Sequence, residues 1–208
     1  MKRLAAAIGV MACAAAALAM PAAQASPPRP VTKVTLTGTT TLSFDDSTVA
    51  RWDDLGVRLA ARPPATMRKN TIALPLAQVT KGAVRHRGGW VLVGPTSGKL
   101  AADDLVIREA PGDVTSTLSF LTLGQQLTLM RSSDVQTKTT PPKVKSKGRV
   151  KTTVKTTTLS GPIRLVDDPA FVLMMNGAIG AYALSPGQVL GTFTTTIVET
   201  TTEVTPKP

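Results

Sequence analysis

The sequence has few of the residues from which disulfides, metal sites and stacking surfaces are built. Its 208 residues include one cysteine, Cys13, one histidine, His86, and only 3% aromatic side chains. A lone cysteine excludes an intramolecular disulfide and thiolate-held structural zinc, and a lone histidine excludes a two-histidine metal site. The fold must therefore be stabilised mainly by burial of aliphatic side chains, for which the chain is long enough.

Long apolar runs are also missing, except at the N-terminus. Residues 1–25 carry two basic residues, an apolar stretch and Ala23-Gln24-Ala25, in that order. This order is typical of a cleavable secretion signal. We expect cleavage before Ser26, with loss of Cys13, and no integral membrane segment in the mature chain. The predicted product is secreted, either extracellular or associated with the cell wall.

Acidic residues are in the minority. Lys and Arg number 24 against 13 Asp and Glu, a net charge of +11, and loss of residues 1–25 leaves 22 minus 13, or +9. Seven of the cations fall within residues 137–157, which hold no acid and form either a basic hairpin or a flexible linker. We predict that six of them bind anionic wall polymers: Lys143, Lys145, Lys147, Arg149, Lys151 and Lys155.

Threonine and valine, by contrast, are abundant and together make up about a quarter of the chain. Both residues favour strands. Short segments of alternating apolar residues, separated by glycine and proline, predict strands over residues 34–44, 57–61, 71–75, 82–86, 90–93, 105–109, 116–123, 127–131 and 192–198. This spacing indicates an all-β fold, an antiparallel β-sandwich that is Ig-like in outline, with two short helices.

Each of the two predicted helices follows a strand and a pair of aspartates. Asp45-Asp46 precedes a helical pattern over residues 47–55. Asp167-Asp168 precedes a second pattern over residues 170–175, which Asn176-Gly177 would close. Aspartate is a common N-cap residue, so the pairs themselves support both helices.

The strands before these helices are similar in sequence. Thr35-Leu36-Thr37-Gly38 recurs as Thr158-Leu159-Ser160-Gly161. The repeat indicates either two pseudo-symmetric halves or chance similarity in a threonine-rich chain. We divide the chain into a signal peptide (1–25), a Pro-rich lead (26–33), one domain (34–200) with a basic insertion (137–157), and a polar tail (201–208).

The residues do not assemble into a recognisable catalytic site. The chain has no Gly-x-Ser-x-Gly elbow, and residues 94–100 depart from a phosphate loop and fit a hairpin turn instead. Helix caps and strand alternation explain the four Asp-Asp pairs. The basic segment holds no aromatic residue on which a base would stack. We therefore expect neither an enzyme nor a nucleic-acid partner.

A set of motifs runs through the whole predicted domain. They are Leu42 to Val57, Pro64-Ala65-Thr66, Leu74-Pro75-Leu76, Gly82-Ala83-Val84-Arg85-His86-Arg87-Gly88-Gly89-Trp90, Leu105-Val106-Ile107, Phe171 and Gly187-Gln188-Val189-Leu190-Gly191. In these segments the chain resembles the HtaA (haem-transport-associated) domain family, secreted proteins of high-GC Gram-positive (actinobacterial) bacteria. The resemblance covers roughly residues 34–198.

The resemblance implies an antiparallel β-sandwich and, in the haem-binding members, a tyrosine on the iron with a histidine nearby. His86 matches that histidine, and Arg85 and Arg87 beside it would lower its affinity for a proton. Residues 42–55, where the tyrosine would lie, contain none. The iron ligand would then have to be Tyr182, the single tyrosine, brought opposite His86 by the fold.

Two functions follow as hypotheses. The first is a secreted, non-enzymatic binding module at the cell envelope, with haem as candidate cofactor, His86 and Tyr182 as its ligands, and haem or a haem protein as partner. The second is an envelope-structural or adhesive protein that binds anionic wall polymers through its basic segment, without haem.

Overall fold

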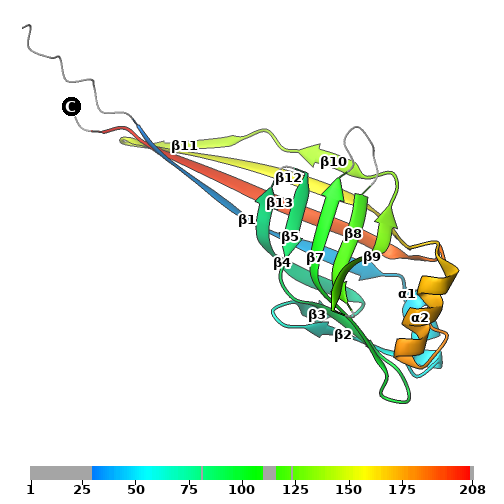
Figure 1. The fold of residues 1–208 in the computed structure, drawn as a ribbon. Coiled ribbons are helices and arrows are strands. Elements are labelled where there is room, and N and C mark those ends of the chain that lie inside the picture. Colours follow the sequence, from blue (N-terminus) through cyan, green and yellow to red (C-terminus); the bar gives the residue numbers. More distant parts are fainter. Residues whose placement is uncertain (1–29, 81, 110–115, 123, 207–208) are drawn as a thin grey trace, which may run out of the picture.

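The structure, a computed structural model, describes residues 30–80, 82–109, 116–122 and 124–206 (Figure 1). The predicted secretion signal, residues 1–25, lies outside this part of the chain. In chain order the elements are β1 (Val31–Phe44), α1 (Asp46–Asp54), β2 (Arg58–Arg62), β3 (Thr66–Arg68), β4 (Thr71–Thr80), β5 (Ala83–His86), β6 (Gly89–Val93), β7 (Lys99–Glu109), β8 (Ser116–Thr122), β9 (Gln125–Ser132), β10 (Gln136–Thr139), β11 (Lys143–Lys147), β12 (Val150–Leu165), α2 (Pro169–Ile179) and β13 (Val189–Val204).

The strands form one antiparallel sheet that closes on itself. Its order runs β7, β5, β4, β1, β13, β12, β9, β8, and pairing of β8 with β7 completes a ring of eight strands. β6 and β2 continue the sheet outward from β7. The predictions of a mostly β, antiparallel chain with two helices are confirmed, but the structure shows a closed barrel where a two-layer sandwich was expected. Both architectures bury alternate residues of each strand, so the sequence pattern does not separate them.

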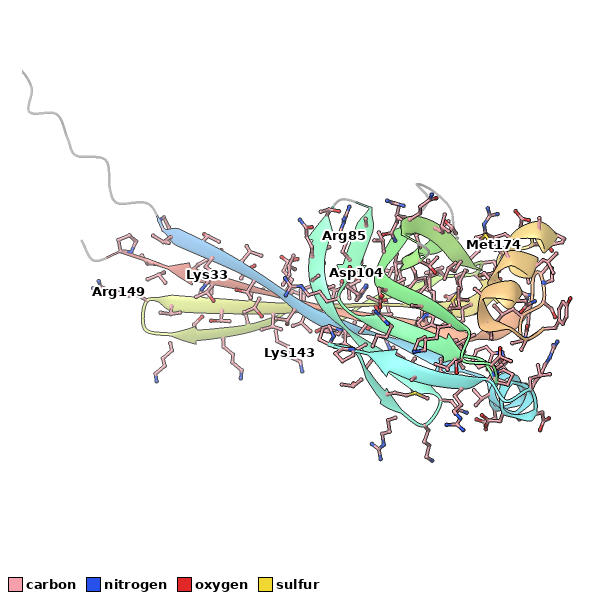
Figure 2. The ribbon with its side chains drawn as sticks, turned by 60° about the horizontal axis from the view of Figure 1, so that its bottom comes forward. Lys33, Arg85, Asp104, Lys143, Arg149 and Met174 are labelled. Atoms are coloured by element: carbon pink, nitrogen blue, oxygen red, sulfur yellow. The ribbon has the colours of Figure 1, made fainter. Side chains whose placement is uncertain are left out.

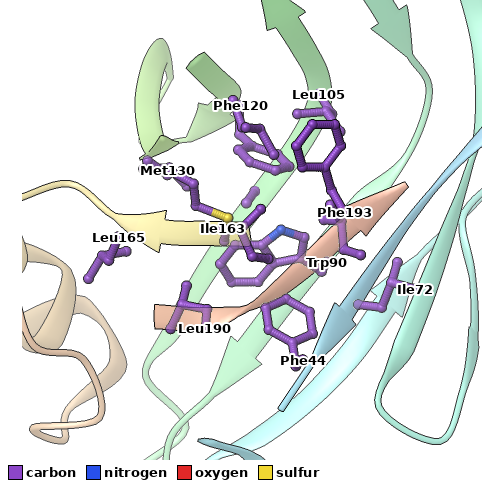
Figure 3. Packing of buried hydrophobic residues seen from close by; sticks show 14 of the residues in the cluster. Phe44, Ile72, Trp90, Leu105, Phe120, Met130, Ile163, Leu165, Leu190 and Phe193 are labelled. Atoms are coloured by element: carbon purple, nitrogen blue, oxygen red, sulfur yellow. The ribbon is translucent and has the colours of Figure 1, made fainter. Parts of the chain in front are cut away.

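The barrel interior is filled by aliphatic and aromatic side chains (Figure 3). The ring centroid of Phe44 lies 5.4 Å from that of Trp52 and 6.1 Å from that of Trp90. The ring centroids of Trp90 and Phe120 are 5.8 Å apart. With Phe193, these residues are each at most 4% exposed. The few aromatic side chains of this protein therefore serve mainly to pack its core.

The Gly88-Gly89 pair is required by close packing of backbones. Gly88 has a φ of +75°, and its carbonyl accepts a 2.9 Å hydrogen bond from the amide of Asp104. Gly89 begins β6 against β7, and a Cβ added there would overlap the backbone carbonyl of Ala102. A motif that carries part of the family resemblance thus has a structural explanation.

Each helix follows one of the two strands that flank β13, as the repeat in the sequence suggested. Asp168 caps α2 by accepting a 3.0 Å hydrogen bond from the amide of Phe171. The helix does not end at Asn176-Gly177 as predicted but runs to Ile179, where Gly180 adopts a φ of +77°. Asn176 is instead buried, and its amide bonds both the N–H and the carbonyl of Leu184 at 2.9 Å.

Three of the strands continue far beyond the barrel (Figure 1). Residues 31–38 of β1, 197–204 of β13 and 150–157 of β12 form, together with β11, a ribbon of order β1–β13–β12–β11 that we call the arm. None of these residues is buried. The basic segment is therefore a paired hairpin, as one of the two predicted alternatives proposed, and not a flexible linker. Within the described ranges, no helix has the length and apolar character needed to cross a membrane.

Candidate functional site

The arm has two faces, because successive residues of a strand point to opposite sides of the sheet. The register places Lys33, Thr202, Thr152 and Lys145 in one row across the four strands. Residues directly opposite in a ladder point to the same side, so this row lies on one face. We call it the basic face.

Three lysines of β11 share the basic face. Lys143 and Lys147 are each two residues from Lys145 and so point the same way, and all three are exposed. Figure 2 shows Lys33 and Lys143 on the arm. The inner strands contribute only valine and threonine to this face: Val150, Thr152, Val154 and Thr156 from β12, and Val198, Thr200, Thr202 and Val204 from β13. Within the arm, the basic face thus carries positive charge and no acidic residue.

The opposite face of the arm is balanced in charge. Lys151 lies directly across from Glu203 and Lys155 from Glu199. The ammonium of Lys151 is 3.7 Å from a carboxylate oxygen of Glu203. Opposite charges across a ladder attract one another, so these two lysines are partly satisfied within the arm.

The register therefore divides the six residues that we predicted to bind polyanions. It brings Lys143, Lys145 and Lys147 together and leaves Lys151 and Lys155 on the other face. Arg149 lies in the turn between β11 and β12, at the end of the arm (Figure 2). Lys33, which was not among the six predicted residues, joins the basic face from more than a hundred residues away.

One signal for this division was present in the sequence. Glu199 and Glu203 are four residues apart, as are Lys151 and Lys155. If the two strands pair antiparallel in the right register, equal spacing allows each lysine to lie opposite one glutamate. The pairing could not be assigned beforehand, because the register between β12 and β13 was unknown.

His86 lies inside the barrel, at 2% exposure. Its Nε2 is 2.7 Å from Oγ1 of Thr40, which is 2.6 Å from Oγ1 of Thr195, and its Nδ1 is 3.3 Å from the carbonyl oxygen of Leu105. A carbonyl only accepts, so we assign the proton to Nδ1 and the acceptor role to Nε2. The imidazole thus links four strands, β5, β1, β13 and β7, and both of its nitrogens are engaged.

Burial lowers the pKa of His86 from 6.5 to about 4, although its hydrogen bond to the Leu105 carbonyl acts in the opposite direction. Arg85, on β5, and Arg87, in the bend that follows it, were expected to lower this pKa, and both are exposed. The imidazole is therefore neutral at physiological pH, and it is suited to a structural role.

Tyr182 lies in a different setting, on the segment that follows α2. Its side chain is 75% exposed, and the nearby helix presents Leu173 and Met174, which are 58% and 45% exposed. A shallow cavity of about 190 Å³ is lined by Tyr182, Leu173 and Asn176, among others. His86 does not line it. The structure thus places His86 inside the barrel and Tyr182 on the surface. In this arrangement the two residues do not form a haem site together.

The carboxylates are likewise dispersed into structural roles. Asp103 forms a salt bridge with Arg62, in which its Oδ1 is 2.7 Å from Nε of the arginine. Asp46 accepts a 2.7 Å hydrogen bond from the side-chain amide of Asn70. Asp168 caps a helix. Among the residues that the structure describes, no three His, Cys, Asp or Glu side chains gather where they could hold a metal ion.

The chain was compared with known families, curated proteins and solved structures. No family model matches the chain, and no curated protein matches it. Among solved structures, the chain is similar to the crystal structure of the haem-binding protein HtaB from Corynebacterium glutamicum. The two are 16% identical, with a TM-score of 0.48, over 83% of this chain and 98% of that one.

Proposed function

We propose that this protein is a secreted, non-enzymatic binding module of the cell envelope that holds a linear polyanion along the basic face of its arm. The observation that carries this proposal is the sorting of charge by strand register. Lys143, Lys145 and Lys147 share a face with Lys33 and with no acid of the arm, whereas Lys151 and Lys155 face glutamates.

The spacing of the lysines favours a polymer over a small anion. Alternate residues of a strand are about 6.7 Å apart, so Lys143, Lys145 and Lys147 form a straight stripe of roughly 13 Å. The neighbouring valine and threonine side chains are shorter than lysine, so the ammonium groups can extend beyond them. An extended chain with regularly repeated charges would meet them in succession, whereas a single phosphate would contact one or two.

The chemistry of the arm also separates one polymer class from another. The arm contains no aromatic residue, so it offers no platform for stacked bases. Contacts from lysine ammonium groups recognise charge without requiring a base or a particular sugar. Anionic polymers of the cell wall therefore suit this face better than nucleic acid does, consistent with the export that we predict for the chain.

The experiment compares two variants with the same change in net charge. Lys143→Gln with Lys145→Gln removes charge from the basic face, and Lys151→Gln with Lys155→Gln removes it from the opposite face. We measure binding to purified cell wall and to inorganic polyphosphate over a range of salt concentrations. The first variant should bind about tenfold more weakly at low salt, and the slope of log K against log[salt] should fall by about 2.

The second variant is the matched control, because it lowers the net charge equally while leaving the basic face intact. It should bind nearly as the unmodified protein does. Equal losses in the two variants would show that total charge, not the basic face, attracts the polymer. Retention that does not depend on salt would exclude the proposal altogether.

A second candidate function is haem capture by Tyr182 alone. Its phenol is exposed beside Leu173 and Met174, an arrangement that offers an oxygen ligand next to apolar surface. Tyr182 would hold ferric haem through its phenolate oxygen. The buried imidazole of His86 takes no part in this candidate.

Hemin titration tests the second candidate directly. If Tyr182 ligates the iron, micromolar hemin should give a shifted Soret band that Tyr182→Phe abolishes and His86→Gln retains. An unchanged hemin spectrum would show that the protein does not bind haem under these conditions and would contradict this candidate. Loss of the band in both variants, with each still folded by circular dichroism, would instead restore the two-residue site that the sequence suggested.

A further inference from the structure

Along the arm, the outer side of β1 has no partner strand in the described chain. β1 pairs with β13 along its whole length, but on its other side β4 pairs only with residues 39–43. Over residues 31–38, no strand of the described chain pairs with that side of β1. We call this stretch the free edge.

The free edge presents a complete set of backbone hydrogen-bonding groups. The amide of Phe44 bonds the carbonyl of Asn70, on the β4 side, whereas the amide of Asp45 bonds Leu190, on the β13 side. These directions alternate along a strand, and the β1–β13 register is uninterrupted from residue 31 to 44. The N–H and C=O groups that point outward therefore belong to Thr32, Val34, Leu36 and Gly38.

The two edges of the arm are protected to different degrees. On β11, three of five residues are lysines, and lysine on an edge strand is a common guard against pairing with other chains. The free edge has one charged residue, Lys33, among eight, and Val31, Val34 and Leu36 are 66%, 56% and 41% exposed. Long, flat and weakly charged edges are templates for strand addition.

We propose that the free edge pairs with the free edge of a second copy of this chain, antiparallel, about a two-fold axis at Thr35. In this register Thr35 lies opposite Thr35 of the second copy, Val34 opposite Leu36, and Thr32 opposite Gly38. All four outward-pointing residues of each copy then form ladder pairs, and Val34 and Leu36 meet as an apolar pair.

The charge and the length of the free edge both fit this partner. Lys33 lies opposite Thr37, so the two copies of Lys33 are four residues apart along the ladder, roughly 14 Å, which exceeds the screening length at physiological salt. Val31 falls opposite Thr39 of the second copy, the first residue of its β1 that pairs with its own β4. The pairing therefore ends where each free edge ends, as an isologous interface requires.

The joined arms would form one continuous sheet with both basic faces on the same side, because a two-fold axis perpendicular to the sheet preserves its faces. The inference rests on the edge and not on any ligand. It is tested without polymer, so its failure would leave the proposal for the basic face unaffected.

Proline substitution separates the two edges of the arm. Val34→Pro removes an outward N–H at the free edge, and proline is tolerated there because no strand of the described residues pairs with that side. Val144→Pro is the matched control: Val144 lies on the β11 edge, its N–H also points outward from the ladder, and it is 54% exposed against 56% for Val34.

Sedimentation velocity gives the mass of each protein, and circular dichroism confirms its fold. The unmodified protein and Val144→Pro should sediment as dimers, and Val34→Pro should show a twofold lower mass. A monomeric unmodified protein at hundreds of micromolar, or a dimer that persists in folded Val34→Pro, would overturn the proposal.

Cysteine cross-linking tests the register. In a Cys13→Ser background, Thr35→Cys places two thiols opposite each other in a non-hydrogen-bonded pair, where Cα atoms are about 4.5 Å apart and a disulfide is feasible. Thr37→Cys is on the same face, but its two copies would be roughly 14 Å apart. Mild oxidation should cross-link the first variant and not the second. Equal cross-linking of both would contradict the axis at Thr35.

Discussion

Replacing Gly89 with alanine is expected to lower the free energy of unfolding by about 3–4 kcal/mol. The added Cβ would overlap the carbonyl of Ala102, a backbone atom of the paired strand β7. A flexible side chain could rotate away, but here two strands must separate at the point where Trp90 enters the core. Urea unfolding followed by tryptophan fluorescence measures the change.

Gly177→Ala is the control of opposite sign. Gly177 lies within α2, is exposed, and has no atom within 4 Å of its added Cβ. Alanine there should raise the free energy of unfolding by about 0.5–1 kcal/mol, because it improves helix propensity without a clash. If Gly89→Ala were as stable as the unmodified protein, the result would contradict the close approach of β6 to β7 at this residue.

This contrast bears on how the family resemblance should be interpreted. One of the segments that carry it contains His86, Gly88 and Gly89, and each has a packing or hydrogen-bonding role in the barrel. A ligand is not needed to explain any of the three. The residues that remain exposed and unexplained by packing are elsewhere, on the arm and beside Tyr182.

Much of the local structure was predictable because it depends on neighbours in sequence. Alternation from Val34 to Phe44 predicted β1, and Asp168 predicted the start of α2. The end of helix α2 was not predictable in this way. Asn176-Gly177 has the composition of a helix end, but Asn176 finds its hydrogen-bond partners in Leu184, a tertiary contact that local propensity does not include.

Closure of the barrel and the faces of the arm were not predictable, because both depend on register between distant strands. Pairing of β7 with β8 closes the ring, although nothing in either segment distinguishes a barrel from a sandwich. The charge excess of the basic segment was clear from the sequence. Which of its lysines are balanced became clear only when β12 was placed against Glu199 and Glu203.

Acidification is expected to destabilise the protein through His86. The unfolded imidazole binds a proton below pH 6.5, whereas burial holds the folded pKa at about 4, so the unfolded state binds more protons between these values. Stability contributed by the neutral imidazole is complete above pH 6.5 and is lost as the pH falls toward 4. The loss is about 3 kcal/mol, because each pKa unit corresponds to about 1.4 kcal/mol.

The measurement is urea unfolding at several pH values between 7 and 4, for the unmodified protein and for His86→Gln. Carboxylates titrate in both proteins, so the difference between the two curves isolates the imidazole. His86→Gln should be less stable at pH 7, since it disturbs the hydrogen bonds to Thr40 and Leu105, but the gap should narrow as the pH falls. Parallel curves, or an imidazole NMR signal that titrates near pH 6.5, would show that His86 is open to water and available to a ligand, contrary to its buried place among β1, β5, β7 and β13.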